Sequence, residues 1–229
     1  MNTMLVSPLL KVSPKGPVSA EGSARVHLRQ GELDGACGPY CMISALITLG
    51  LMDRDDVLEN MHRWKGSSRN GRIRDALYAF GVLNGEGTDG SDLLWLTEHY
   101  KSVGLKACHV EGTKKQIFET VAGGIEMGDL PIVGVQWQGG GAHWMLVVGY
   151  QGKESDEDFQ LTHLLCLDPG QEAPRASLWN AVLEVFDGEG ASVNLGRMSS
   201  NFWGMDGNPT KCQIKDTVIL SLSGKRKKS

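Results

Sequence analysis

The sequence predicts an α+β fold in which a helical N-terminal lobe packs on a C-terminal lobe made of an antiparallel β-sheet. Up to about residue 128, apolar residues recur at the three- and four-residue spacing of helices. From Leu130 onward, short β-branched or apolar runs alternate with glycine-rich or acidic turns, as strands do. We therefore expect one domain over residues 25–223, with the helical lobe at about 25–128, the sheet lobe at about 129–223 and a cleft between them.

The two ends of the chain are predicted to lie outside this domain. Residues 1–24 are rich in Ser, Pro and Gly and carry no sustained periodicity, so we expect a flexible N-terminal arm that could contact a partner protein. Residues 224–229 contain the run KRKK and are predicted to be a solvated basic tail.

The first predicted helix runs from Cys37 to Leu49. Its apolar residues recur at helical spacing, Pro39 suits a first turn, and Gly50 can end the helix. Further helices are expected over 54–64, 72–80, 91–103 with Ser91 as N-cap, and 113–122 with Thr113 as N-cap. Strands are expected in the later segments PIVGVQW, HWMLVVGY, FQLTHLLCLD and KCQIKDTVILSLS.

Composition excludes several classes of partner. The 229 residues are 41% hydrophobic and 22% charged, which is typical of a soluble globular protein. Lys and Arg are scattered and the net charge is −4, so we expect no nucleic-acid partner. No apolar run approaches the roughly 18 residues of a spanning helix, so we expect no membrane partner. The 5 cysteines are odd in number and irregularly spaced, which favours a reducing, cytoplasmic location where the protein is made, with export without a cleaved signal left open.

Cys37 is the strongest candidate nucleophile. A thiol ordinarily has a pKa of about 8.5, and the N-terminus of a helix lowers it. Gly35, Ala36 and Gly38 would let the backbone turn sharply and expose the sulfur. The alternative is that the segment CGPYC holds two buried helix cysteines or half of a metal site. The chain offers no second Cys or His pair at ligand spacing, so we expect neither metal nor cofactor.

His143 and Asp168 are predicted to meet at one end of a hairpin. His143 follows a glycine-rich loop and opens an apolar strand, and a second strand from Phe159 to Leu167 follows a polar turn. Antiparallel pairing would place His143 opposite residues 166–168, so that Asp168 could orient the imidazole and stabilise its charged form. Asp168 begins the sequence DPG, which is also an ordinary turn signal.

The order of these motifs resembles a known family. Gln30, Cys37-Gly38, Ala142-His143-Trp144 and Asp168-Pro169 resemble the papain-like cysteine peptidase superfamily, most closely its bacteriocin-leader-processing peptidases and related bacterial enzymes. The resemblance covers about residues 25–170 and implies a papain-like fold. It also implies a thiol protease in which Cys37, His143 and Asp168 form the triad and the Gln30 side chain donates to the oxyanion. Asn201, within NFWG, is an alternative orienter of His143.

Three functions remain open at this point. The first is a cysteine peptidase that hydrolyses a peptide or isopeptide amide of a protein or peptide substrate through a thioester on Cys37. The second is a transglutaminase or glutamine deamidase, acting as an effector or toxin with the same triad. The third is a non-catalytic module that keeps the papain fold and binds a partner in its cleft.

Overall fold

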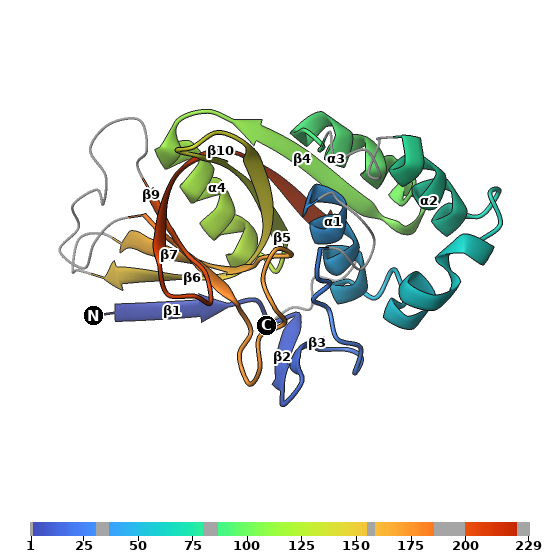
Figure 1. The fold of residues 1–229 in the computed structure, drawn as a ribbon, viewed down its shortest axis with the longest axis horizontal. Coiled ribbons are helices and arrows are strands. Elements are labelled where there is room, and N and C mark those ends of the chain that lie inside the picture. The colour runs from blue at the N-terminus through green and yellow to red at the C-terminus, as the bar shows by residue number, and fades with distance from the viewer. Residues whose placement is uncertain (1, 31–36, 80–86, 155–158, 186–199, 224–229) are drawn as a thin grey trace.

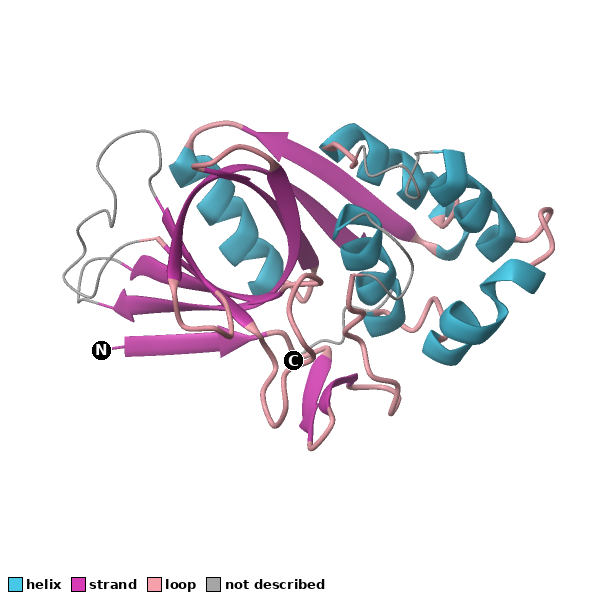
Figure 2. Ribbon diagram, in the orientation of Figure 1, coloured by secondary structure: helices cyan, strands magenta, loops and turns pink. Residues whose placement is uncertain are grey.

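The computed structural model describes residues 2–30, 37–79, 87–154, 159–185 and 200–223. Most of the regular structure in these residues is β-sheet, and the sheet closes into a barrel of six antiparallel strands accompanied by helices (Figures 1 and 2). The predicted papain-like arrangement, a helical lobe packed on a sheet lobe, is therefore wrong. Closure depends on pairing between strands that are far apart in the sequence, which local periodicity does not encode.

The strands of the barrel are paired in the order β6, β5, β10, β9, β8, β7, and β7 pairs back onto β6. Their bounds are β5 Leu130–Trp137, β6 Ala142–Glu154, β7 Phe159–Leu167, β8 Ala181–Glu184, β9 Ser200–Trp203 and β10 Pro209–Leu222. Two further strands extend the sheet, because β1 (Asn2–Val6) pairs with β6 and β4 (Leu105–Glu111) pairs with β10. Alternation along each strand sends successive side chains to opposite faces of the sheet.

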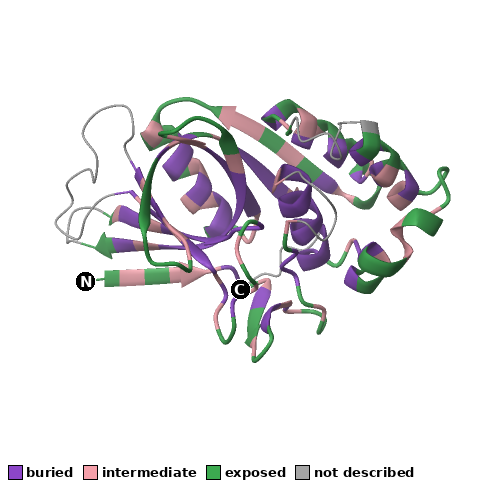
Figure 3. Ribbon diagram, viewed as in Figure 1, coloured by how far each residue is buried: buried purple, intermediate pink, exposed green. Residues whose placement is uncertain are grey.

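Each face of this sheet packs into its own apolar core (Figure 3). One core joins α4 (Lys114–Glu126) to residues of β5, β6, β7, β8, β9 and β10, including Val135, Met145 and Leu183. The other core places α1 (Cys37–Thr48) against the opposite face of β6, which contributes Leu146 and Val148. α1 is buried on all sides from Gly38 to Thr48, so the barrel and the remaining helices fix its position closely.

The other helices lie around α1 and agree in part with the sequence. They are α2 (Arg69–Ala79), α3 (Gly90–Glu98), a π-helical turn η1 (Asp56–Asn60) and 3₁₀ turns η2 (Met61–Arg63) and η3 (Lys101–Val103). The predicted N-cap Thr113 is confirmed, since its hydroxyl accepts a hydrogen bond from Gln116 N–H. The N-cap of α3 is Asp89 and not Ser91, because Asp89 forms a reciprocal capping box with Asp92.

The N-terminal segment differs from the flexible arm predicted over 1–24. β1 is hydrogen-bonded to β6, while β2 (Leu10–Ser13) and β3 (Gly16–Ser19) form a small hairpin beneath α1 (Figure 1). The predicted basic tail at 224–229 lies outside the described residues. None of the helices in the described part of the chain has the length and apolar character needed to span a membrane.

Candidate active site

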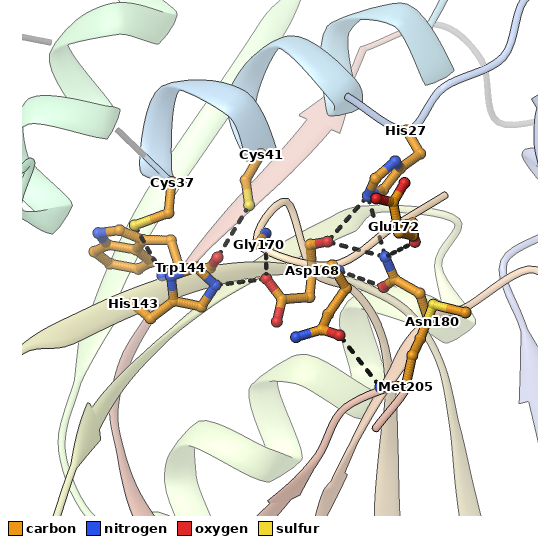
Figure 4. A network of polar contacts seen from close by, with 11 residues as sticks. His27, Cys37, Cys41, His143, Trp144, Asp168, Gly170, Glu172, Asn180 and Met205 are labelled. Carbon is orange, nitrogen blue, oxygen red and sulfur yellow. Dashed lines mark hydrogen bonds and ion pairs between the residues drawn. The ribbon is translucent and has the colours of Figure 1, made fainter. Parts of the chain in front are cut away.

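Cys37 is the first residue of α1 and faces the start of β6 (Figure 4). The backbone N–H of Trp144 donates a hydrogen bond to Cys37 Sγ at 3.3 Å. One helical turn later, Cys41 Sγ donates to the carbonyl oxygen of the same Trp144, also at 3.3 Å. A single residue of β6 is thus bound to both thiols of α1, and this fixes the height of the helix relative to the strand.

His143 precedes Trp144 in β6 and meets Asp168 directly. His143 Nε2 lies 2.6 Å from Asp168 Oδ1, and the backbone N–H of Gly170 donates to the same oxygen at 2.7 Å (Figure 4). The Asp168 carboxylate is buried, and the ring of Trp137 stacks on the imidazole with centroids 5.9 Å apart. Because Nε2 is engaged by Asp168, the other ring nitrogen, Nδ1, is the atom available to the thiol.

The electrostatics of the three groups favour a charged pair. Burial by itself raises the pKa of Cys37, but the hydrogen bond and charge of His143, with backbone N–H groups, bring it below its ordinary value. Burial likewise opposes the charged form of His143, yet hydrogen bonds to Asp168 and Cys37 raise its pKa to about 10. Between the lowered pKa of Cys37 and the raised pKa of His143, a Cys37 thiolate faces a His143 imidazolium.

Cys41 lies in the opposite environment. It is fully enclosed, and burial together with the neighbouring Cys37 raises the pKa of its thiol well above 9.0. A neutral thiol that donates to a carbonyl is not an attacking group. Of the two cysteines in CGPYC, the structure therefore singles out Cys37, as the sequence does.

The predicted route by which Asp168 reaches His143 is wrong in detail. The sequence places His143 opposite residues 166–168, whereas Leu146 pairs with Leu167 and strand pairing ends there. The difference arises because β6 continues to Glu154, which pairs with Phe159, so the register is displaced from the turn onward; the irregularity between Gln151 and Gly152 is reversed by the one between Val147 and Gly149. Asp168 lies just beyond the paired region, from which its side chain reaches back to the imidazole.

Two side chains that the sequence does not single out as functional fix the backbone of Asp168. Asn180 Oδ1 accepts the Asp168 N–H at 2.7 Å, while Asn180 Nδ2 donates to the carbonyl oxygens of Asp168 and Glu172, both at 2.9 Å (Figure 4). His27 Nε2 lies 2.9 Å from the same Asp168 oxygen and 3.1 Å from Asn180 Nδ2, so this ring nitrogen contacts both groups. Both side chains are buried.

The sequence gives no periodic pattern that would indicate Asn180, because an irregular loop connects it to Asp168 and the short strand β8 (Ala181–Glu184) begins directly after it. His27 takes a structural part in this network.

The other two predicted site residues, Gln30 and Asn201, make no described contact with the triad through their side chains. The Gln30 backbone N–H donates to Pro169 O at 2.6 Å, which ties this segment to the loop after Asp168. Residues 31–36, which connect Gln30 to Cys37, lie outside the described residues, so the oxyanion role of Gln30 stays a prediction. Asn201 Nδ2 donates to Glu184 Oε2 at 3.2 Å on β8 and β9, so among the described residues the contact to His143 comes from Asp168 and not from this alternative.

Comparison with models of known protein families and with curated proteins finds no match for this chain. The site contains a half-buried Cys37 thiolate that can act as a nucleophile and, beside it, a His143 imidazolium that can carry a proton. The buried Asp168 carboxylate is hydrogen-bonded to the imidazolium and orients it. Such a set can attack a carbonyl carbon and protonate the group that leaves.

Proposed function

We propose that this protein is a cysteine peptidase that hydrolyses a peptide or isopeptide amide through a thioester on Cys37. The observation that carries the proposal is that His143, whose Nε2 lies 2.6 Å from buried Asp168, faces the Cys37 thiol and lowers its pKa although burial raises it. Burial without this compensation raises the pKa of the neighbouring Cys41, so the ionisation of Cys37 is specific to its place beside His143. The order Gln30, Cys37, His143, Asp168, which resembles that of papain-like cysteine peptidases, supports the same chemistry.

In the first half of the reaction, the Cys37 thiolate attacks the carbonyl carbon of the scissile amide. The tetrahedral oxyanion forms near the N-terminus of α1, where backbone N–H groups without helical partners point outward. We expect the Cys37 N–H and the Gln30 side-chain amide to donate to it. His143 then gives its Nδ1 proton to the leaving amine, and the C–N bond breaks to leave a thioester.

In the second half, water replaces the amine. Neutral His143 removes a proton from the water as it attacks the thioester carbonyl, and the carboxylic acid leaves as the Cys37 thiolate is regenerated with His143 protonated again. Asp168 keeps the imidazole in one orientation and stabilises its charged form throughout. These steps use only residues of the chain and water.

A peptide library incubated with the purified chain tests the proposal. Mass spectrometry should find new termini, and these should vanish with Cys37→Ala. Cys108→Ala is a matched control, because Cys108 is an exposed cysteine on β4, away from the predicted triad. Conversion of glutamine to glutamate, or cross-linking of glutamine to an amine, without new termini would replace the peptidase with a deamidase or transglutaminase. Cleavage that survives in Cys37→Ala would refute the role of this thiol, and a Cys37 pKa at or above 9.0 with no turnover would favour a binding module.

A further inference from the structure

A second group of chemically active side chains lies on the paired strands β4 and β10. Asp216 pairs directly with Glu111, and His109 is two residues before Glu111 on the same strand. Residues two apart on a strand share a face of the sheet, and directly paired residues do as well. His109, Glu111 and Asp216 therefore project from one face of the sheet.

Their ligand atoms converge. His109 Nε2 lies 2.8 Å from Asp216 Oδ2 and 3.9 Å from Glu111 Oε1. The three atoms all lie within 4.8 Å of one another. The side chains of His109 and Asp216 are each 16% exposed, whereas that of Glu111 is 77% exposed and can move.

The backbone around this group makes room for it. A methyl group added at Gly90 would lie 2.2 Å from His109 Nε2, and one added at Gly134 would lie 2.2 Å from Asp216 Oδ1. Any larger residue at either position would collide with a ligand side chain. Two glycines on different elements, α3 and β5, thus accommodate His109 and Asp216.

The charges of the group are unbalanced. Two carboxylates directly opposite on paired strands repel each other, and Asp89 at the start of α3 adds its charge to the field at Asp216. The ring of His109 packs against Gly90 in the first turn of α3. A divalent cation would balance the negative charge of the carboxylates.

We propose that His109 Nε2, Glu111 and Asp216 bind one divalent cation of the zinc class, at a site separate from Cys37. Zinc binds imidazole nitrogen and carboxylate oxygen at roughly 2.0–2.2 Å, which places tetrahedral ligand atoms roughly 3.3 Å apart. To reach this value, His109 Nε2 and Asp216 Oδ2 must move slightly apart from 2.8 Å. His109 Nε2 and Glu111 Oε1 must come slightly closer than 3.9 Å, which the exposed Glu111 side chain can do by rotating. Water completes the fourth position. One nitrogen and two carboxylates suit zinc better than calcium, which takes six or more oxygens.

The cation would fasten β4 to β10 behind the candidate active site. Gly134, which makes room for Asp216, also lies against the indole of Trp144, since a methyl group there would approach this ring to 3.0 Å. The site is structural, and its occupancy is expected to stabilise the folded chain in proportion to ligand concentration.

Zinc titration of the metal-free full chain tests this site. Cys37 is first alkylated with iodoacetamide, because a thiolate beside an imidazole also binds zinc. Calorimetry should show one binding event, weakened at least about tenfold in Asp216→Asn and in Glu111→Gln, since each substitution replaces a carboxylate ligand. Glu184→Gln is the matched control, because Glu184 faces His163 across β7 and β8 at 4.0 Å, and it should bind zinc as the wild type does.

The melting temperature gives a second readout. Zinc should raise it in the alkylated wild type and in Glu184→Gln, and not in Asp216→Asn. The exposed Glu111→Gln variant serves if Asp216→Asn does not fold. Absence of binding by the wild type, or equal binding by Glu111→Gln and the wild type, would overturn the proposal. Neither result depends on whether Cys37 is catalytic.

Discussion

Replacement of Asn180 by alanine should destabilise the protein and loosen Asp168. Asn180 is buried, accepts one hydrogen bond from Asp168 N–H and donates two to the carbonyl oxygens of Asp168 and Glu172. Alanine leaves the Asp168 N–H without its acceptor, which costs about 1–3 kcal/mol, and loses two further bonds worth about 1 kcal/mol each. Because His27 Nε2 lies 2.9 Å from the Asp168 carbonyl oxygen and can donate to it once Asn180 Nδ2 is removed, we expect a net loss of about 2–4 kcal/mol.

Urea unfolding measures this loss. With a slope of about 2 kcal/mol per molar urea, the midpoint should fall by about 1–2 M without a change in slope. Asn208→Ala is the matched control, because Asn208 is an exposed asparagine whose side chain contacts Asp206 and makes no contact with Asp168 among the described hydrogen bonds. We expect its effect to be under about 1 kcal/mol. A shift for Asn180→Ala no larger than that of the control would refute the role of Asn180 in holding Asp168.

Three further predictions concern the triad. Asp168→Asn removes a charge-assisted hydrogen bond worth about 1.5–3 kcal/mol, so the pKa of His143 should fall by about one to two units and the rate of hydrolysis by about 10³–10⁴-fold. Both are measured from pH–rate profiles, and a profile identical to that of the wild type would contradict this prediction. Cys41→Ala should lower the free energy of unfolding in urea by about 1–2 kcal/mol while Cys37 is still alkylated, and Cys41→Ser should recover part of this loss because its hydroxyl can donate the same hydrogen bond. If Cys41→Ala abolished alkylation of the protein, Cys41 and not Cys37 would be the nucleophile. Hydrolysis should decline as the pH rises through about 10, because His143 then loses the proton that the leaving amine needs, and a rate that still climbs beyond this pH would exclude that role.

The local parts of the fold were predictable, and the closure of the sheet was not. The helix at Cys37–Thr48 and the cap at Thr113 follow from apolar spacing and from a side chain that accepts a backbone N–H, both of which act within a few residues. The barrel depends on β10 pairing with β5 and β9, and on β7 returning to β6. β8 and β9 are only four residues long, so alternation gives them almost no signal.

The candidate site was likewise predictable only where local sequence patterns determine the position of a residue. Cys37 follows from its place at a helix start, and His143 from a glycine-rich loop that enters a strand. Asp168 was found through a hairpin whose register is displaced because β6 continues past Tyr150 to Glu154, and it reaches His143 because its side chain spans the difference. Asn180 contacts Asp168 through a folded loop, so only the tertiary structure reveals it.

The pH dependence of Cys37 alkylation tests the central claim most directly. The rate of reaction with iodoacetamide, followed by mass mapping of the Cys37 peptide, should give a wild-type thiol pKa below the roughly 8.5 of an ordinary thiol. In His143→Ala, only backbone N–H groups oppose the effect of burial, so the pKa should rise and the rate at neutral pH should collapse. A wild-type pKa at or above about 8.5, or one that His143→Ala leaves unchanged, would contradict the assignment of Cys37 and His143 as an ionised pair.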